Sequence, residues 1–337
     1  MLPFINDILQ YDSLSIVGLE KNTGKTECLK YVLDRLPVQT KRIAVTSIGI
    51  DGETVDQVTR TQKPEIVLRE GMYFGTSETH YRQRRLVSEL IDVSDENTSL
   101  GRVVTARALT GGKILLSGPS SASSLRRWMG EMHKLGIDLV IIDGALSRMS
   151  SASPAVSQSM ILATGAAYSA NINTLVSKTA HVVDLVNLEL TSEKNRERLS
   201  LLDKGLWFID KQGELHPLDT MTSLSKDIHF QGMEDCETLY VAGALVDGFL
   251  EKVRKNKNLK QVELVVRDFT KIFVTPQQFR LFIKAGGRIS VLQKSKLIAV
   301  TVNPTSPSGY VLDSDTLCAR LSEAIQLPVY DLIKNNG

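Results

Sequence analysis

The sequence predicts an α/β protein with a mostly parallel sheet covered by helices on both faces, followed by a C-terminal α/β part. Short runs rich in β-branched residues alternate with segments whose apolar residues recur at helical spacing. The run at residues 139–142 is continuously apolar, as expected for a strand in the middle of a parallel sheet. A loop that contains glycine joins the first expected strand to the first expected helix, an arrangement in which such loops bind phosphate.

Composition and charge indicate a globular protein and disfavour a disordered, nucleic-acid-binding, disulfide-rich or membrane-spanning one. Of the 337 residues, 42% are hydrophobic and 23% are charged, which favours a sizeable core and excludes a disordered chain. The formal net charge of +2 argues against a broad surface for nucleic acid. The three cysteines, Cys28, Cys236 and Cys318, are scattered, so no disulfide framework is expected. Without a secretory signal or an apolar run near the ~20 residues of a membrane helix, the sequence predicts a soluble, cytoplasmic protein that binds neither nucleic acid nor membrane.

Strands and helices of the first half follow from these patterns. Strands are expected at residues 14–18, 42–48, 138–143, 160–164 and 182–188. Helices are expected around residues 29–36 and 128–132, where apolar side chains recur every three or four positions. Residues 103–109 and 113–117 are expected to be strands on either side of a hairpin-like Thr-Gly-Gly break. The charge run within residues 54–100 predicts a solvated helix and loop.

The second half also alternates between segments expected to be strands and segments expected to be helices. Strands are expected at residues 206–209, 239–242, 262–267, 289–292, 298–302 and 328–331, with a small hairpin around Gly213. Thr275 followed by Pro276 predicts the start of a helix, with Thr as the cap and Pro at the first helical position. A polar stretch that follows Gly213 and reaches Asp235 predicts a boundary near residue 230, which divides the chain into residues 1–230 and 231–337. One continuous sheet through both parts is the alternative.

The loop at residues 18–26 has the sequence GLEKNTGKT and predicts a phosphate-binding site of the P-loop NTPase type. Gly24 allows the backbone to approach phosphate groups, and the N–H groups of residues 23–26 lie at a helix N-terminus, where anions bind. Lys25 is expected to bridge the outer phosphates of a nucleotide, and the Thr26 hydroxyl is expected to bind Mg²⁺. A chance match on an ordinary turn is the alternative, which the flanking strand and helix disfavour.

This loop departs from the usual pattern at one position. The pattern places a glycine five residues before Gly24, where this sequence has Leu19, whereas Gly18 comes one residue earlier. The loop is therefore expected either to open differently or to hold one extra residue. The residues expected to contact the nucleotide are Gly18, Asn22, Thr23, Gly24, Lys25, Thr26, Glu27 and Asn303.

A phosphate loop needs a carboxylate at the end of a neighbouring strand to hold magnesium or its water. Asp143 follows the apolar run 139–142, so it is expected to bind Mg²⁺ and to act in catalysis with Lys25; the alternative is a residue that caps a turn. Asp51 and Glu53 follow the second strand, at the edge where α/β sheets bind ligands. Either could be a second magnesium contact or orient an attacking water, with Asp51 preferred and a plain turn as the alternative.

The nucleotide base is expected to be adenine. The Asn/Thr-Lys-x-Asp tetrad of guanine-reading GTPases is absent from the sequence, which favours ATP over GTP. Asn303, at the end of the expected strand at 298–302, could offer its amide to adenine. The serine-rich residues 117–124 are a candidate switch loop for the terminal phosphate, with an ordinary turn as the alternative.

Two other classes of site are not expected. The histidines lie far from one another and from the cysteines in the sequence, which disfavours a zinc site. The Gly-x-Ser-x-Gly segment that would indicate a hydrolase nucleophile is absent from the sequence. Each histidine is expected to be a surface or satisfied core residue: His80, His133, His181, His216 and His229.

Residues 20–26, together with the apolar strand that ends at Asp143 and the strand at 43–48 immediately after the first helix, resemble the SIMIBI branch of phosphate-loop proteins. That branch includes dethiobiotin synthetase, the cobyric acid amidation enzymes and the MinD-type ATPases. Its signature lysine would fall at Glu20, and Lys21 is one place away. More narrowly, three stretches resemble the reactivating factors of lysine 5,6-aminomutase, a family of lysine-fermenting bacteria: GLEKNTGKTE at 18–27, IDGALSR at 142–148 and ILATGA at 161–166.

The resemblance implies a Mg²⁺-dependent ATPase that helps a cobalamin enzyme exchange damaged cofactor for intact adenosylcobalamin. It also implies a second subunit similar to the MutS ATPases, and it is compatible with a homo-oligomer. One alternative is an ATP-dependent ligase or kinase for a small metabolite, in which Ser147, Arg148 and the loop at 49–53 would contact the substrate. Another is a scaffold that binds no nucleotide, which the intact loop disfavours.

Overall fold

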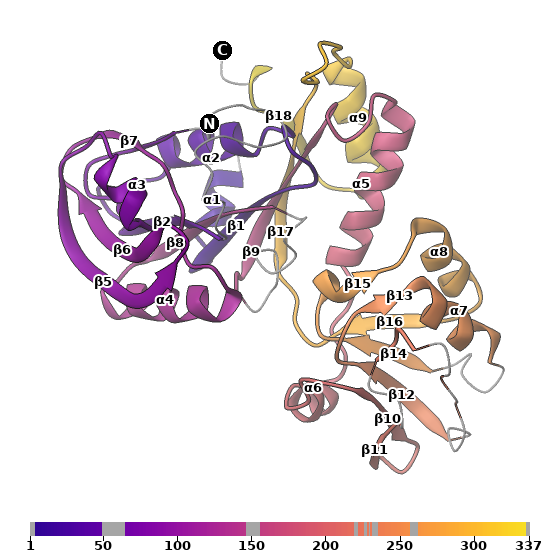
Figure 1. Ribbon diagram of the computed structural model, residues 1–337. Helices are drawn as coiled ribbons and strands as arrows, with labels where there is room; N and C mark the ends of the chain where they lie inside the picture. Colours follow the sequence, from indigo (N-terminus) through magenta and orange to yellow (C-terminus); the bar gives the residue numbers. More distant parts are fainter. Residues whose placement is uncertain are drawn as a thin grey trace. The chain divides into compact units, whose positions relative to one another are not determined.

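The computed structural model describes residues 4–48, 65–145, 156–218, 222–225, 228, 230, 235–256 and 262–334. They belong to two compact units (Figure 1). Unit 1 takes in residues 1–179 and 296–337, and unit 2 takes in residues 180–295. The chain therefore leaves unit 1, forms unit 2, and returns to complete unit 1.

Unit 1 is built on a nine-stranded sheet with the order β18-β17-β9-β1-β8-β2-β4-β6-β5. In chain order its strands are β1 (Ser13–Gly18), β2 (Ile43–Ser47), β4 (Tyr73–Ser77), β5 (Ser88–Thr98), β6 (Gly101–Ala108), β8 (Leu139–Ala145), β9 (Ser159–Gly165), β17 (Lys296–Asn303) and β18 (Val329–Asp331). The strands from β18 to β4 are parallel, whereas β6 runs antiparallel to both β4 and β5. The expected mixed α/β fold with a mostly parallel sheet is confirmed.

Helices pack on both faces of this sheet. The helices of unit 1 are α1 (Phe4–Ile8), α2 (Lys25–Arg35), α3 (Glu78–Arg82), α4 (Ala122–Lys134), α9 (Ser314–Ile325) and the larger part of α5 (Ile172–Val186). Ile141 of β8 packs in one apolar cluster with α1 and α2, whereas its neighbours Val140 and Ile142 pack in another with α4. Burial on both faces explains why this strand is continuously apolar. Among the helices that the structure describes, none is both long and apolar enough to cross a membrane.

Unit 2 contains a five-stranded sheet with the order β11-β10-β12-β14-β16. Its strands are β10 (Leu206–Asp210), β11 (Leu215–Pro217), β12 (Cys236–Val241), β14 (Glu263–Val266) and β16 (Arg288–Val291), and its helices are α6 (Glu193–Leu199), α7 (Asp247–Lys255), α8 (Pro276–Lys284) and the short η3 (Phe269–Lys271). Strands β12, β14 and β16 are parallel, and β10 and β11 form the expected antiparallel hairpin around Gly213. Thr275 caps α8 by accepting a hydrogen bond from the Gln278 N–H, so this expected helix start is confirmed.

Two small sheets complete the fold. In unit 1, β3 (Ile66–Leu68) pairs antiparallel with β7 (Gly112–Ile114). In unit 2, β13 (Leu245–Val246) pairs parallel with β15 (Ile272–Phe273). The pairing of β7 with β3 corrects the expected hairpin over residues 103–117, because β6 pairs with β4 and β5 instead.

The domain boundary also differs from the expected one. Residue 230 lies within unit 2, and residues 296–337 belong to the same unit as the N-terminal residues. The reason is that β17 pairs in parallel with β9, so a strand near the end of the chain completes the first sheet; in Figure 1 these segments of distant sequence lie side by side. Neither a division at 230 nor one continuous sheet describes this arrangement.

Two segments have a different secondary structure from the one expected. Residues 182–186 belong to helix α5, because Leu175, Thr179, Val183 and Val186 are buried at helical spacing. Within the charge run at 54–100, residues 88–98 form the long strand β5, and residues 49–64 lie outside the described part. β5 is an edge strand without a buried residue, so it lacks the alternating apolar pattern by which strands are recognised.

Candidate functional site

The loop at residues 18–26 leaves the carboxyl end of β1 and leads directly into α2. β1 lies between β8 and β9, so the loop emerges between the ends of these two strands. The Leu19 N–H donates a hydrogen bond to the Ala163 carbonyl of β9 at 2.9 Å. Leu19 therefore continues the backbone pairing of β1 with β9 by one residue, and its side chain is buried.

A tight turn closes the first part of the loop. The Thr23 hydroxyl is buried and donates to the Glu20 carbonyl at 2.8 Å. A Cβ atom at Gly18 would lie 2.9 Å from the Thr23 oxygen and 3.3 Å from the Glu20 oxygen. Gly18 is therefore the glycine that allows the loop to fold back against its own strand.

Two residues in the left-handed region turn the chain into helix α2. Asn22 has φ +61° and Gly24 has φ +89°. Gly24 is the N-cap residue of α2 and has no side chain with which to cap the helix. In contrast, Ser121 caps α4 and Asp313 caps α9 through side-chain oxygens. The N-terminus of α2 thus offers backbone N–H groups and a positive dipole end to an external anion.

An ion pair lies at the mouth of the loop. Lys25 Nζ is 2.9 Å from Asp143 Oδ1, and the two side chains are 26% and 16% exposed. Asp143 pairs in register with Ile16 of β1, and its strand β8 is the direct neighbour of β1. The structure therefore brings together Lys25 and Asp143, two residues that the sequence pattern assigned to one site from positions 118 apart.

Three further residues assigned to this site occupy different positions around it. Thr26 is partly exposed in the first turn of α2. Glu27 is exposed and its carboxylate pairs with Lys30 Nζ at 2.9 Å. Asn303, at the end of β17, donates from Nδ2 to the Asn22 carbonyl at 2.9 Å, so it contacts the loop itself. No sequence pattern indicated this contact between Asn303 and Asn22.

Other residues assigned from the sequence cannot be placed. Asp51, Glu53, Ser147, Arg148 and His229 lie outside the described residues. Within the described part, no group of three or more histidine, cysteine, aspartate or glutamate side chains is arranged to hold a metal ion.

Ser117, the first residue of the candidate switch, is packed in a buried polar network. Its hydroxyl lies 2.6 Å from the Ser77 hydroxyl and 2.7 Å from His80 Nδ1, and all three side chains are at most 1% exposed. The next residue, Gly118, packs closely against the end of β2: a Cβ atom at this position would lie 2.2 Å from the Ser47 carbonyl oxygen. No sequence pattern indicated that Ser77, His80 and Ser117 would meet. The network ties this segment to the ends of β2 and β4.

Burial raises the pKa values of two ionisable groups next to the loop, Cys28 and Tyr168. Burial raises the pKa of the Cys28 thiol on α2 to about 12. A hydrogen bond with Thr301 lowers this pKa, and the nearby Asp143 carboxylate raises it. Burial also raises the pKa of Tyr168, with a further contribution from the Glu20 carboxylate. Both groups therefore stay neutral at physiological pH.

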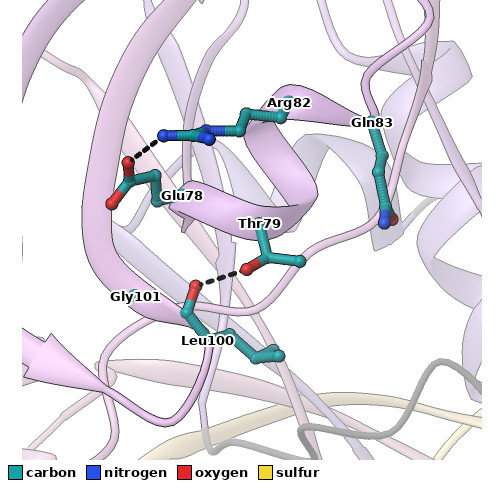
Figure 2. A pocket seen from close by; sticks show the side chains of 6 residues that line it. All are labelled: Glu78, Thr79, Arg82, Gln83, Leu100 and Gly101. Atoms are coloured by element: carbon teal, nitrogen blue, oxygen red, sulfur yellow. Dashed lines mark hydrogen bonds and ion pairs between the residues drawn. The ribbon is translucent and has the colours of Figure 1, made fainter.

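A pocket at the start of α3 is lined by Glu78, Thr79, Arg82, Gln83, Leu100 and Gly101 (Figure 2). Its charged side chains are occupied with each other, since Arg82 and Glu78 pair at 2.6 Å. The Thr79 hydroxyl donates to the Leu100 carbonyl at 2.9 Å. The first contact lies within α3, the second ties α3 to the turn that precedes β6, and neither assigns a ligand to the pocket.

Comparisons with protein-family models, curated proteins and solved structures find no match to this chain. The geometry that bears on function is the ion pair of Lys25 and Asp143 beside the uncapped N-terminus of α2.

Proposed function

We propose that this chain is a P-loop-type protein that binds ATP with Mg²⁺ at the loop of residues 18–26 and hydrolyses it. The observation that carries the proposal is the ion pair between Lys25 and Asp143, 2.9 Å apart, beside a helix N-terminus that has no side-chain cap. An ammonium group and uncapped N–H groups together suit a polyphosphate. The neighbouring carboxylate suits the cation that accompanies it.

The residues present fit Mg²⁺. The Thr26 hydroxyl and the Asp143 carboxylate are hard oxygen donors, which Mg²⁺ prefers. Mg²⁺ is usually held by one or two carboxylates together with substrate phosphates, so a cage of protein ligands is not required. When bound, the cation would neutralise the charge on the phosphates. Lys25 would exchange its contact with Asp143 for the outer phosphates, which leaves the Asp143 oxygens for the cation.

Two parts of the proposal depend on the sequence. Asp51 is proposed to orient the attacking water because it follows β2, whose end lies beside Asp143: Ser47 and Asp143 pair in register. ATP is proposed in preference to GTP because the guanine-reading tetrad is absent from the sequence.

The decisive test is Lys25→Ala, measured by isothermal titration calorimetry with ATP and MgCl₂. ATP binding should be lost, because the variant lacks the charge that faces the phosphates, while the circular dichroism spectrum and melting temperature stay close to those of the wild type. The matched control is Lys30→Ala on the same helix, where the removed ammonium pairs with exposed Glu27. Equal ATP affinity in Lys25→Ala and wild type would contradict the assignment of the loop.

We further propose that the nucleotide drives a subunit of a reactivating factor for the adenosylcobalamin-dependent lysine 5,6-aminomutase, beside a MutS-like ATPase subunit. This proposal is supported by the three stretches of resemblance at 18–27, 142–148 and 161–166. The test is capture of purified aminomutase with and without ATP and MgCl₂, followed by assay of cofactor exchange. An aminomutase that neither binds nor regains activity would contradict this role, while the nucleotide site would be unaffected.

A ligase or kinase for a small metabolite is not favoured by any observation among the described residues. Its expected substrate contacts, Ser147, Arg148 and the loop at 49–53, lie outside them.

A further inference from the structure

Asn303 lies where three segments of unit 1 meet. It is the last residue of β17 and pairs in register with Gly165 of β9. A Cβ atom at Gly165 would lie 2.1 Å from the Asn303 carbonyl oxygen, so this close approach requires glycine. The same oxygen accepts a hydrogen bond from the Ala166 N–H at 2.8 Å. The backbone of Asn303 is therefore fixed by the end of β9.

The side chain of Asn303 reaches across to the phosphate loop. Its Nδ2 donates to the Asn22 carbonyl at 2.9 Å, and its Oδ1 accepts from the Thr305 N–H at 3.1 Å. The orientation of the amide follows from these partners, because a carbonyl can only accept and an N–H can only donate. Each end of the amide is thus engaged within the protein.

This contact acts on the loop at a residue in the left-handed region. Asn22 has φ +61°, a conformation that residues with side chains seldom adopt. Because a trans peptide is planar, holding the Asn22 carbonyl also fixes the Thr23 N–H, which points in the opposite direction. Gly24 packs on the same side chain, since a Cβ atom at Gly24 would lie 3.1 Å from Asn303 Cβ.

We infer that Asn303 is a positioning residue for polyphosphate binding, because it holds the peptide between Asn22 and Thr23 in the orientation that the phosphate loop requires. The inference rests on the proposed nucleotide function. It gives Asn303 a role different from contact with adenine, and the two roles are separable. A residue that positions the loop affects binding of the phosphates, whether or not a base is attached to them.

The test compares Asn303→Ala with the wild type for two ligands, ATP and inorganic tripolyphosphate, each titrated with MgCl₂. A lost hydrogen bond to a backbone carbonyl typically reduces an equilibrium constant about three- to tenfold, and both affinities should fall by the same factor. Hydrogen exchange at residues 22–26 of the ligand-free variant should rise, while β9 keeps its protection. The matched control is Asn173→Ala on α5, where the amide oxygen accepts from Arg320 at 2.6 Å and tripolyphosphate affinity should not change.

Four results would overturn the inference. A loss of affinity for ATP but not for tripolyphosphate would assign Asn303 to the base. Unchanged affinity for both ligands, or loss of protection throughout β9, would leave no positioning role. A wild-type chain that binds neither ligand would overturn the proposed function, and this inference with it.

Discussion

The left-handed turn at Gly24 predicts a measurable cost for the smallest substitution, Gly24→Ala. An L-residue with φ near +89° is destabilised by roughly 1–2 kcal/mol relative to the right-handed region. The added Cβ would also lie 3.1 Å from Asn303 Cβ, which is closer than most carbon contacts, so Asn303 has to move. We expect the free energy of unfolding of unit 1 to fall by about 1–2 kcal/mol.

Thermal denaturation followed by circular dichroism measures this effect. For a unit of this size, ~1 kcal/mol shifts the melting temperature by about 2–4 °C, so a decrease of about 2–8 °C is expected. Gly130→Ala is the matched control, because Gly130 lies in helix α4 with nothing within 4 Å of the position of an added Cβ. There the same substitution should stabilise the protein by about 0.5–1 kcal/mol. The two variants should therefore shift the melting temperature in opposite directions.

A Gly24→Ala variant as stable as the wild type would contradict the expected cost of a left-handed conformation at residue 24. Tripolyphosphate affinity provides a second readout, since Ala at residue 24 must either strain the N-terminus of α2 or rotate it. A variant with lowered stability and undiminished tripolyphosphate affinity would confirm the strain at residue 24 and would show that Gly24 does not contribute to the proposed binding of phosphate.

Two other predictions concern packing and the thiols. Trp128→Phe removes the 2.9 Å hydrogen bond from Nε1 to the buried Thr105 hydroxyl and should lower the unfolding free energy by about 1–3 kcal/mol; an unchanged urea midpoint would contradict this. Burial raises the pKa of Cys28 and of Cys236 to about 12, so at pH 8 an alkylating reagent should modify at most Cys318 in the native chain and all three thiols after denaturation. Since burial raises both pKa values above the ordinary thiol value of 9.0, the free energy of unfolding should be unaffected by these thiols below pH 9 and should fall as the pH rises from 9 towards 12.

Sequence patterns predicted the centre of unit 1 well. Residues 139–142 are buried and apolar without interruption, as expected for a strand covered on both faces, and residues 14–18 are buried throughout although they include Ser15. The patterns gave the wrong secondary structure for β5 and for the end of α5. β5 is a solvated edge strand, and α5 carries β-branched residues, which favour strands when the helical spacing of its buried residues is overlooked.

Contacts between distant segments were beyond the reach of local patterns. The pairing of β17 with β9 joins residues about 140 positions apart, and no spacing rule links Asn303 to Asn22. The same holds for the buried network of Ser77, His80 and Ser117, whose members lie on separate elements. Such contacts depend on strand order, which a single sequence does not specify.

The place of β17 in the chain affects how the protein can be synthesised. When the ribosome has made the chain up to residue 295, all of unit 2 exists, but β9 still has an open edge where β17 will pair. Such an edge can pair wrongly with other strands until residues 296–303 emerge and cover it. A nascent chain of that length already contains the complete motif GLEKNTGKT, but it lacks the side chain that holds it. The loop at residues 18–26 is encoded near the start of the message, but its contact with Asn303 can form only close to the end of translation.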